Sequence, residues 1–195
     1  MLPSTAMVDT VQIRDALDQL ARLLKTLSAD VQHAFREAID HAQQGKEEES
    51  QRSRRNAARA LFALMEGMVY GMKQAAYEFD QLLGLKTFGR AEIAFLREEE
   101  YTLQDNGKAR VRPARLRTQA NLRFAFEALT RAFRSRVSSK PQGEGWEAFG
   151  RALRLRHRLT HPKRADQLSV GDDELHDLVK ARGWFSTTAK KAGQL

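Results

Sequence analysis

The sequence predicts an all-α protein, a helical bundle of about five to seven helices. Three observations favour this class. Apolar residues recur at helical spacing along most of the 195 residues, the four prolines lie outside the strongly periodic stretches, and helix and strand patterns do not alternate. The length allows one well-cored domain, with or without a helical appendage.

The first 45 residues predict two helices that form an N-terminal hairpin or extension. A narrow apolar seam marks the first helix, and Ser28 or Asp30 can cap the second. The polar segment 43–55 is either a linker or an exposed helix start, so we expect domains at 1–45 and 46–195. The seam consists of Ile13, Leu17, Leu20, Leu24 and Leu27, and the second helix places Val31, Phe35, Ile39 and Ala42 on one face.

The stretch 56–83 predicts the central core helix, because its apolar face is wide. Gly84 is expected to end this helix, and a shorter helix over 89–101 follows. The Asn-Gly pair at 106–107 favours a tight turn. Residues 102–112 are therefore expected to form a small hairpin or, alternatively, a basic loop.

Three more helices are expected in the C-terminal part. The first runs over 113–137 and ends at the segment SSKPQGEG. The second opens at Trp146 and ends at a proline, because the residue before proline is disfavoured in the α region. The third begins near Ser169, where Ser169 and Asp172 have capping-box spacing, and it leaves a frayed tail after Trp184.

The composition excludes several classes of protein. No cysteine is present, which excludes disulfides, thiolate metal sites and a cysteine nucleophile. No apolar run approaches the roughly 20 residues of a membrane span, and the N-terminus lacks the basic and apolar start of a secretory signal. We expect a cytoplasmic protein without a membrane partner.

The positive charge is concentrated in two segments. The net charge is +8, yet residues 110–136 hold eight arginines against the single acid Glu127, and residues 151–164 hold six basic residues and no acid. These segments sum to +13, so the rest of the chain is net acidic. Such localised charge favours a polyanionic partner, with nucleic acid ahead of an anionic membrane; the alternative is an arginine-rich solvent face.

The segment RLRHRLTHPKR, residues 154–164, combines fixed positive charge with two imidazoles. His157 and His161 have the spacing of a helical zinc site, which His176 and Asp177 could complete, but the nearby arginines repel a divalent cation. We expect neither a metal nor a cofactor. Anion chemistry fits better, because arginine presents a fork of donors to phosphate and histidine exchanges protons near neutral pH. RNA supplies its own nucleophile, the 2′-hydroxyl.

This segment resembles the R-x4-6-H motif of the HEPN superfamily, whose members are all-α domains, often homodimeric, that are common in toxin–antitoxin and phage-defence systems. Arg156, the polar His157, three further residues and His161 fit the pattern, and the helix is expected to end at the proline that follows. The resemblance covers roughly residues 54–187. Arg154 also satisfies the spacing; we favour Arg156, because the family often has a polar residue directly after the arginine.

The resemblance implies that His161 is the catalytic imidazole and that Arg156 stabilises the phosphate. His157 would orient one of them or touch RNA, and Glu66 would hold Arg156 or His161 in place. Some relatives carry a modified tyrosine two residues after the histidine, where this chain has Lys163. Arg154 is a supporting residue, and the expected RNA-binding residues are Arg110, Arg112, Arg115, Arg117, Arg158, Lys163 and Arg164.

Three functions follow from these expectations, and the third is a structural or regulatory helical bundle whose basic faces only solubilise it. The leading one is a metal-independent endoribonuclease of toxin or phage-defence type that cleaves RNA by 2′-hydroxyl attack. Its expected partners are RNA, a second copy of the chain and an antitoxin or sensor protein. The alternative is a non-catalytic helical module that binds nucleic acid or a partner protein. The first two differ in whether Arg156 and His161 carry out chemistry.

Overall fold

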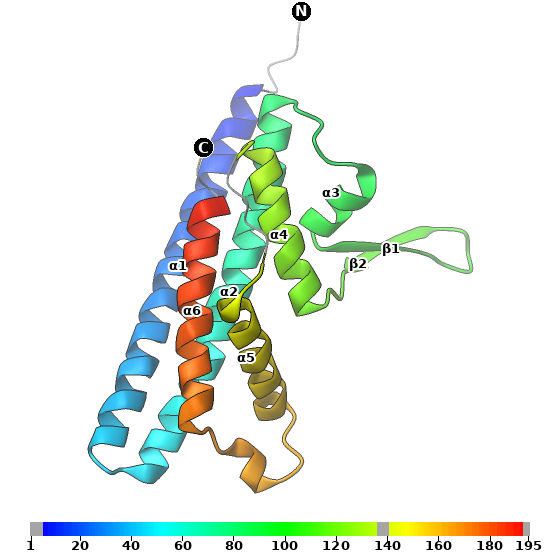
Figure 1. Cartoon of the computed structure of the whole chain (residues 1–195). Coiled ribbons are helices and arrows are strands. Elements are labelled where there is room, and N and C mark those ends of the chain that lie inside the picture. Colours follow the sequence, from blue (N-terminus) through cyan, green and yellow to red (C-terminus); the bar gives the residue numbers. More distant parts are fainter. Residues whose placement is uncertain (1–5, 136–140, 193–195) are drawn as a thin grey trace, which may run out of the picture. The chain divides into compact units, whose positions relative to one another are not determined.

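The computed structural model describes the backbone of residues 6–135 and 141–192, and the side chains of residues 18–135 and 141–192 (Figure 1). The predicted all-α class is confirmed within these residues, which form six α-helices and one two-stranded hairpin. The elements are α1 (Ala6–Gln43), α2 (Glu47–Leu83), α3 (Arg90–Leu96), β1 (Glu99–Leu103), β2 (Ala109–Pro113), α4 (Thr118–Ala132), α5 (Glu144–Thr160), the 3₁₀ helix η1 (Ala165–Leu168) and α6 (Asp172–Ala192).

The chain divides into two compact units. We call one the motif unit, which comprises Leu20–Met68 and Pro141–Thr188 and so includes the segment 154–164. We call the other the hairpin unit, which comprises Met1–Gln19, Val69–Lys140 and Ala189–Leu195. The division into domains at residue 45 stays a prediction.

The motif unit has an aromatic and aliphatic core between its helices. Phe62 of α2, Phe149 of α5, and Leu178 and Phe185 of α6 are each at most 2% exposed. The rings of Phe62 and Phe149 lie 6.0 Å apart, and Trp146 stacks on Phe149 at 5.3 Å. Because a helix turns once every 3.6 residues, this burial of one face of α5 leaves its basic side chains toward the other faces.

The hairpin unit packs α3 and α4 against the second half of α2. A small buried cluster of Ala76, Phe88, Leu96, Ala128 and Ala132 forms part of its core. Strands β1 and β2 pair in antiparallel register from Glu99 opposite Pro113 to Leu103 opposite Ala109. The hairpin expected near 102–112 is therefore confirmed, with Gly107 at φ +75° in the turn, where glycine is not strained.

The prediction of two N-terminal helices is wrong, because α1 is one helix from Ala6 to Gln43. Ser28 and Asp30 lie inside it instead of capping a second helix. The buried side chains of Val31, Ala34, Phe35 and Ala38 continue the apolar face without a break, so burial outweighs the capping preference. The side chains of Ile13 and Leu17 lie outside the described residues.

Most of the polar segment 43–55 is a helix start, since α2 begins at Glu47, and only residues 44–46 connect it to α1. Gly84 ends this helix at φ +59°, as expected. The helix predicted over 89–101 is shorter, because the chain turns at Glu98 (φ +56°) into β1. The helix predicted over 113–137 is shorter at both ends. It begins only at Thr118, since Pro113 pairs in the sheet, and it ends at Ala132, after which Arg134 adopts φ +51°.

Helix α6 begins at Asp172 and continues to Ala192, so both predicted limits need correction. Ser169 lies before the helix, and the side chain of Glu174 instead accepts the Gly171 N–H at 3.1 Å, the reciprocal half of a capping box. The expected frayed tail is wrong up to residue 192, since Thr188 and Ala192 are buried and extend the helical period.

Candidate phosphate site on helix α5

Helix α5 ends where the sequence predicts, after Thr160 and before Pro162. His161 occupies the C-cap, and its backbone N–H donates to the His157 carbonyl at 3.1 Å. The Thr160 hydroxyl donates to the Arg156 carbonyl at 2.8 Å. These two bonds satisfy carbonyls of the last turn, and they fix the backbone that presents the exposed imidazole of His161.

Arg156 points from α5 to α2. Its guanidinium donates to the carboxylate of Glu66 at 2.6 Å and lies over the ring of Phe62, 5.7 Å from the centroid. The side chain of Arg156 is 31% exposed and that of Glu66 is 49% exposed, so the pair borders solvent. Of the two partners expected for Glu66, the structure therefore places Arg156 against it.

Arg154, His157 and His161 form a second set on α5. Arg154 and His157 are three residues apart and lie on one face of the helix, whereas His161 follows at the C-cap with a non-helical backbone (φ −128°); all three side chains are exposed. Within the residues described, none of the three side chains has a hydrogen bond or ion pair. The two candidate motif arginines thus differ: an acid holds Arg156, whereas Arg154 shares a helix face with His157 and has no such partner among the described residues.

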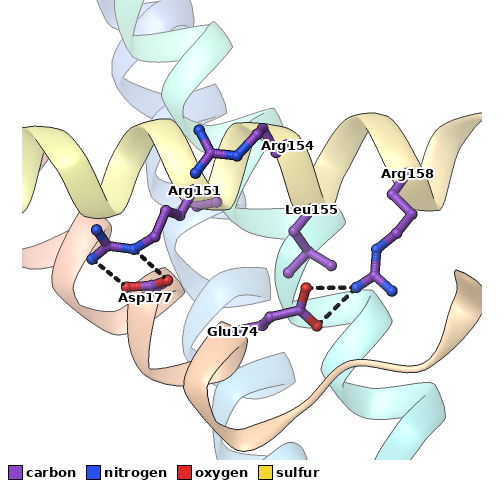
Figure 2. Close-up of a pocket in the computed structure, with 7 residues that line it drawn as sticks. Arg151, Arg154, Leu155, Arg158, Glu174 and Asp177 are labelled. Atoms are coloured by element: carbon purple, nitrogen blue, oxygen red, sulfur yellow. Dashed lines mark hydrogen bonds and ion pairs between the residues drawn. The ribbon is translucent and has the colours of Figure 1, made fainter.

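Two other arginines of α5 are bound to α6 (Figure 2). Arg151 donates to both carboxylate oxygens of Asp177, at 2.8 and 2.7 Å, and Arg158 donates to both oxygens of Glu174, at 2.6 and 2.7 Å. The hydrogen bonds from Arg151 hold the pKa of Asp177 below its ordinary value. Much of the positive charge of α5 is therefore paired with acidic residues.

The chain after His161 is anchored to the start of α2. The Gln51 amide donates to the Val170 carbonyl at 3.2 Å and accepts the Val170 N–H at 2.8 Å. Arg54 donates to the same carbonyl at 3.0 Å and pairs with Asp172 at 2.6 Å. Gln51 and Arg54 were not predicted as site residues, because they lie in a run of polar residues. The signal that could have found this buried face is the spacing of three and four residues between Ser50, Ser53 and Arg54, which are all buried.

The remaining expected RNA-binding residues are exposed and differ in their partners. Arg112 on β2 pairs with Glu100 at 2.8 Å, and Arg164 pairs with Asp166 at 3.0 Å. Arg110 and Arg117 have no hydrogen bond or ion pair from their side chains to any described residue, and the same holds for Lys163. Arg110, Arg112, Arg115 and Arg117 belong to the hairpin unit, whereas Arg158, Lys163 and Arg164 belong to the motif unit.

The four possible metal ligands do not gather. In the described part of the chain, no three histidine, aspartate or glutamate side chains form a group able to hold a metal ion. Asp177 is instead bound to Arg151. No helix within residues 6–135 and 141–192 is long and apolar enough to cross a membrane.

Comparison with known proteins gives no match, whether to a protein-family model, to a curated protein or to a solved structure. Function is therefore inferred from the residues of α5 and their partners.

Proposed function

We propose that this chain is a HEPN-like, metal-independent endoribonuclease that acts in the cytoplasm. The observation that carries the proposal is the bond of 2.6 Å between Arg156 and Glu66. A carboxylate that accepts one N–H of a guanidinium restrains its position and leaves its other N–H donors for a phosphate. His161 follows on the same helix, at a capped and exposed end.

The proposed reaction uses the substrate's own 2′-hydroxyl. His161 takes the hydroxyl proton, the 2′-oxygen bonds to phosphorus, and the bond from phosphorus to the 5′-oxygen breaks. The leaving 5′-oxygen takes a proton from water or from the imidazolium of a second copy. Arg156 stabilises the negative charge on the non-bridging oxygens as it develops. The products are a 2′,3′-cyclic phosphate and a 5′-hydroxyl end.

The other partners belong to the same proposal. A homodimer would bring two copies of Arg156 and His161 together, and an antitoxin or sensor protein would control the activity. His157 would orient the motif or touch RNA. The exposed Arg110, Arg115, Arg117 and Lys163 supply charge for the RNA backbone.

The test is RNA cleavage by the full chain in EDTA, with the variants His161→Ala, Arg156→Ala and Glu66→Gln. We expect the rate to fall by about 100-fold to 10,000-fold without His161 and by about 100-fold without Arg156. Glu66 is a positioning residue, so Glu66→Gln should lower kcat more than it changes KM. The matched control is His33→Ala, which removes an exposed histidine of α1.

Two results would contradict the enzyme. Cleavage that persists in both the His161→Ala and Arg156→Ala variants would assign the activity elsewhere. Intact RNA with retained, salt-sensitive binding would favour the alternative, a non-catalytic module. Circular dichroism melting of each variant separates lost chemistry from lost folding.

A further inference from the structure

A pocket of about 270 Å³ lies between α5 and α6 within the motif unit. Its charged lining consists of Arg151, Arg154 and Arg158 from α5 and Glu174 and Asp177 from α6 (Figure 2). The rest of the lining is apolar and comes from α5, namely Ala152 and Leu155. Three arginines therefore line one small space, beside a patch without polar groups, and two of them point to different acids of α6.

One of the three positive charges in the pocket lining is not paired with an acid of the described residues. Arg151 and Arg158 each have a carboxylate partner, whereas Arg154 has none among the described residues, so the lining carries a net charge of +1. Arg158 uses only one terminal nitrogen for both oxygens of Glu174. Each guanidinium has five N–H donors, so Arg158 retains donors for a second anion.

We propose that this pocket binds a phosphate group. A cation would meet three guanidinium groups, whereas a phosphate presents several acceptor oxygens that arginine forks can share. Arg154 would be the primary contact, with Arg151 and Arg158 donating from either side while still bound to α6. The volume is below that of most pockets for drug-sized ligands, which fits one phosphate and a small attached group.

The position of Arg154 relates the pocket to the motif. Arg154 and His157 lie on one face of α5 and His161 is its C-cap; at the helical rise per residue, Arg154 and His161 are separated by about 10 Å along the axis. A phosphate in the pocket would thus lie beside the one that His161 reaches. If RNA is its source, the pocket is a subsite for a neighbouring phosphate, and this part of the inference rests on the proposed function.

The first experiment titrates inorganic phosphate into the full chain and follows the backbone amides of α5 and α6 by NMR. We expect shifts confined to the pocket and about tenfold weaker binding in Arg154→Gln. Arg36→Gln is the matched control, because it removes the same charge from an exposed position on α1. Asp177→Asn should bind phosphate more tightly, because it removes a competing carboxylate. Shifts spread over the surface, or equal binding by Arg154→Gln and Arg36→Gln, would overturn the proposal.

The second experiment identifies the source of the phosphate. A 2′-O-methyl RNA oligonucleotide lacks the nucleophile, so its binding is measured independently of cleavage. Weaker binding of this RNA by Arg154→Gln than by Arg36→Gln assigns the pocket to RNA. Equal RNA binding, with phosphate binding still dependent on Arg154, assigns it to a free phosphate or a small phosphorylated ligand. Phosphate binding and binding of the 2′-O-methyl RNA can both be measured even if the protein does not cleave RNA. The proposal of a phosphate pocket and the proposal of an endoribonuclease can therefore fail independently.

Discussion

At the scale of single residues, Lys73 has the most unusual environment outside the candidate site. Its side chain is fully buried in the hairpin unit, where it donates to Glu98 at 2.5 Å and to Asn121 at 2.9 Å. Burial lowers the pKa of Lys73, and the bond to Glu98 opposes this. The backbone of Glu98 adopts φ +56°, which is strained for a residue other than glycine, and in this conformation its carboxylate accepts the hydrogen bond from Lys73.

The first prediction is that Glu98→Gln destabilises the protein by about 2 kcal/mol at pH 7, because a buried ammonium loses its counter-charge. The measurement is urea unfolding. Glu100→Gln is the control, since Glu100 pairs with Arg112 on an exposed strand and such pairs contribute little. Equal losses in the two variants would contradict a special role for the buried pair.

The pH dependence of the same variant has a definite sign. Without Glu98 the pKa of Lys73 should fall further, so above that value the unfolded chain holds a proton that the folded chain lacks. Stability then rises with pH toward the ordinary lysine value near 10.4. We expect the deficit of Glu98→Gln to be largest near neutral pH and to shrink as pH rises. A deficit that grows with pH would oppose this account.

At the scale of elements, the packing of α5 against α6 depends on one glycine. A Cβ atom at Gly145 would lie 2.6 Å from Cγ of Trp184, a distance that real contacts do not reach. The same ring lies 5.4 Å from Trp146 and 5.8 Å from Phe149. Gly145 thus lets the first turn of α5 approach α6 closely, which helps position the pocket farther along both helices.

The second prediction concerns Gly145→Ala, which should destabilise by about 1–3 kcal/mol through overpacking. Gly183→Ala is the matched substitution inside α6, where a Cβ meets nothing within 4 Å. It should stabilise by about 0.5–1 kcal/mol, because alanine loses less backbone entropy in a helix. Thermal melting of the two variants should therefore show shifts of opposite sign.

At the scale of the whole molecule, less of the net charge of +8 is available to bind nucleic acid than the count of basic residues suggests. Acids hold the guanidinium groups of Arg112, Arg151, Arg156, Arg158 and Arg164, each within 3.0 Å. Unpaired cations contact phosphate without first breaking an ion pair. They should therefore dominate the salt dependence of nucleic-acid binding.

The third prediction compares two double variants by the salt dependence of their RNA binding. Arg110→Gln with Arg117→Gln removes two unpaired arginines and should lower the slope of log K against log salt by about 1.4 for single-stranded RNA. Arg112→Gln with Arg164→Gln removes two paired arginines and should change the slope less. The same change in both would show that pairing does not decide which arginines bind.

Sequence by itself determined the helical class and the end of α5 before Pro162, because local periodicity and proline sterics act within a few residues. At Asn106-Gly107 it predicted a tight turn but left a hairpin and a basic loop open, and the pairing of β1 with β2 decided for the hairpin. It divided α1 into two helices and misplaced both limits of α6, where burial outweighs local preference. Only the tertiary structure decided that Glu66 pairs with Arg156, that acids of α6 hold Arg151 and Arg158, and that Arg154 is left unpaired among the described residues. Which side chains pair between two helices depends on which helix faces pack together. Glu66 and Arg156 are 90 residues apart, so nothing in the sequence around either residue indicates their contact.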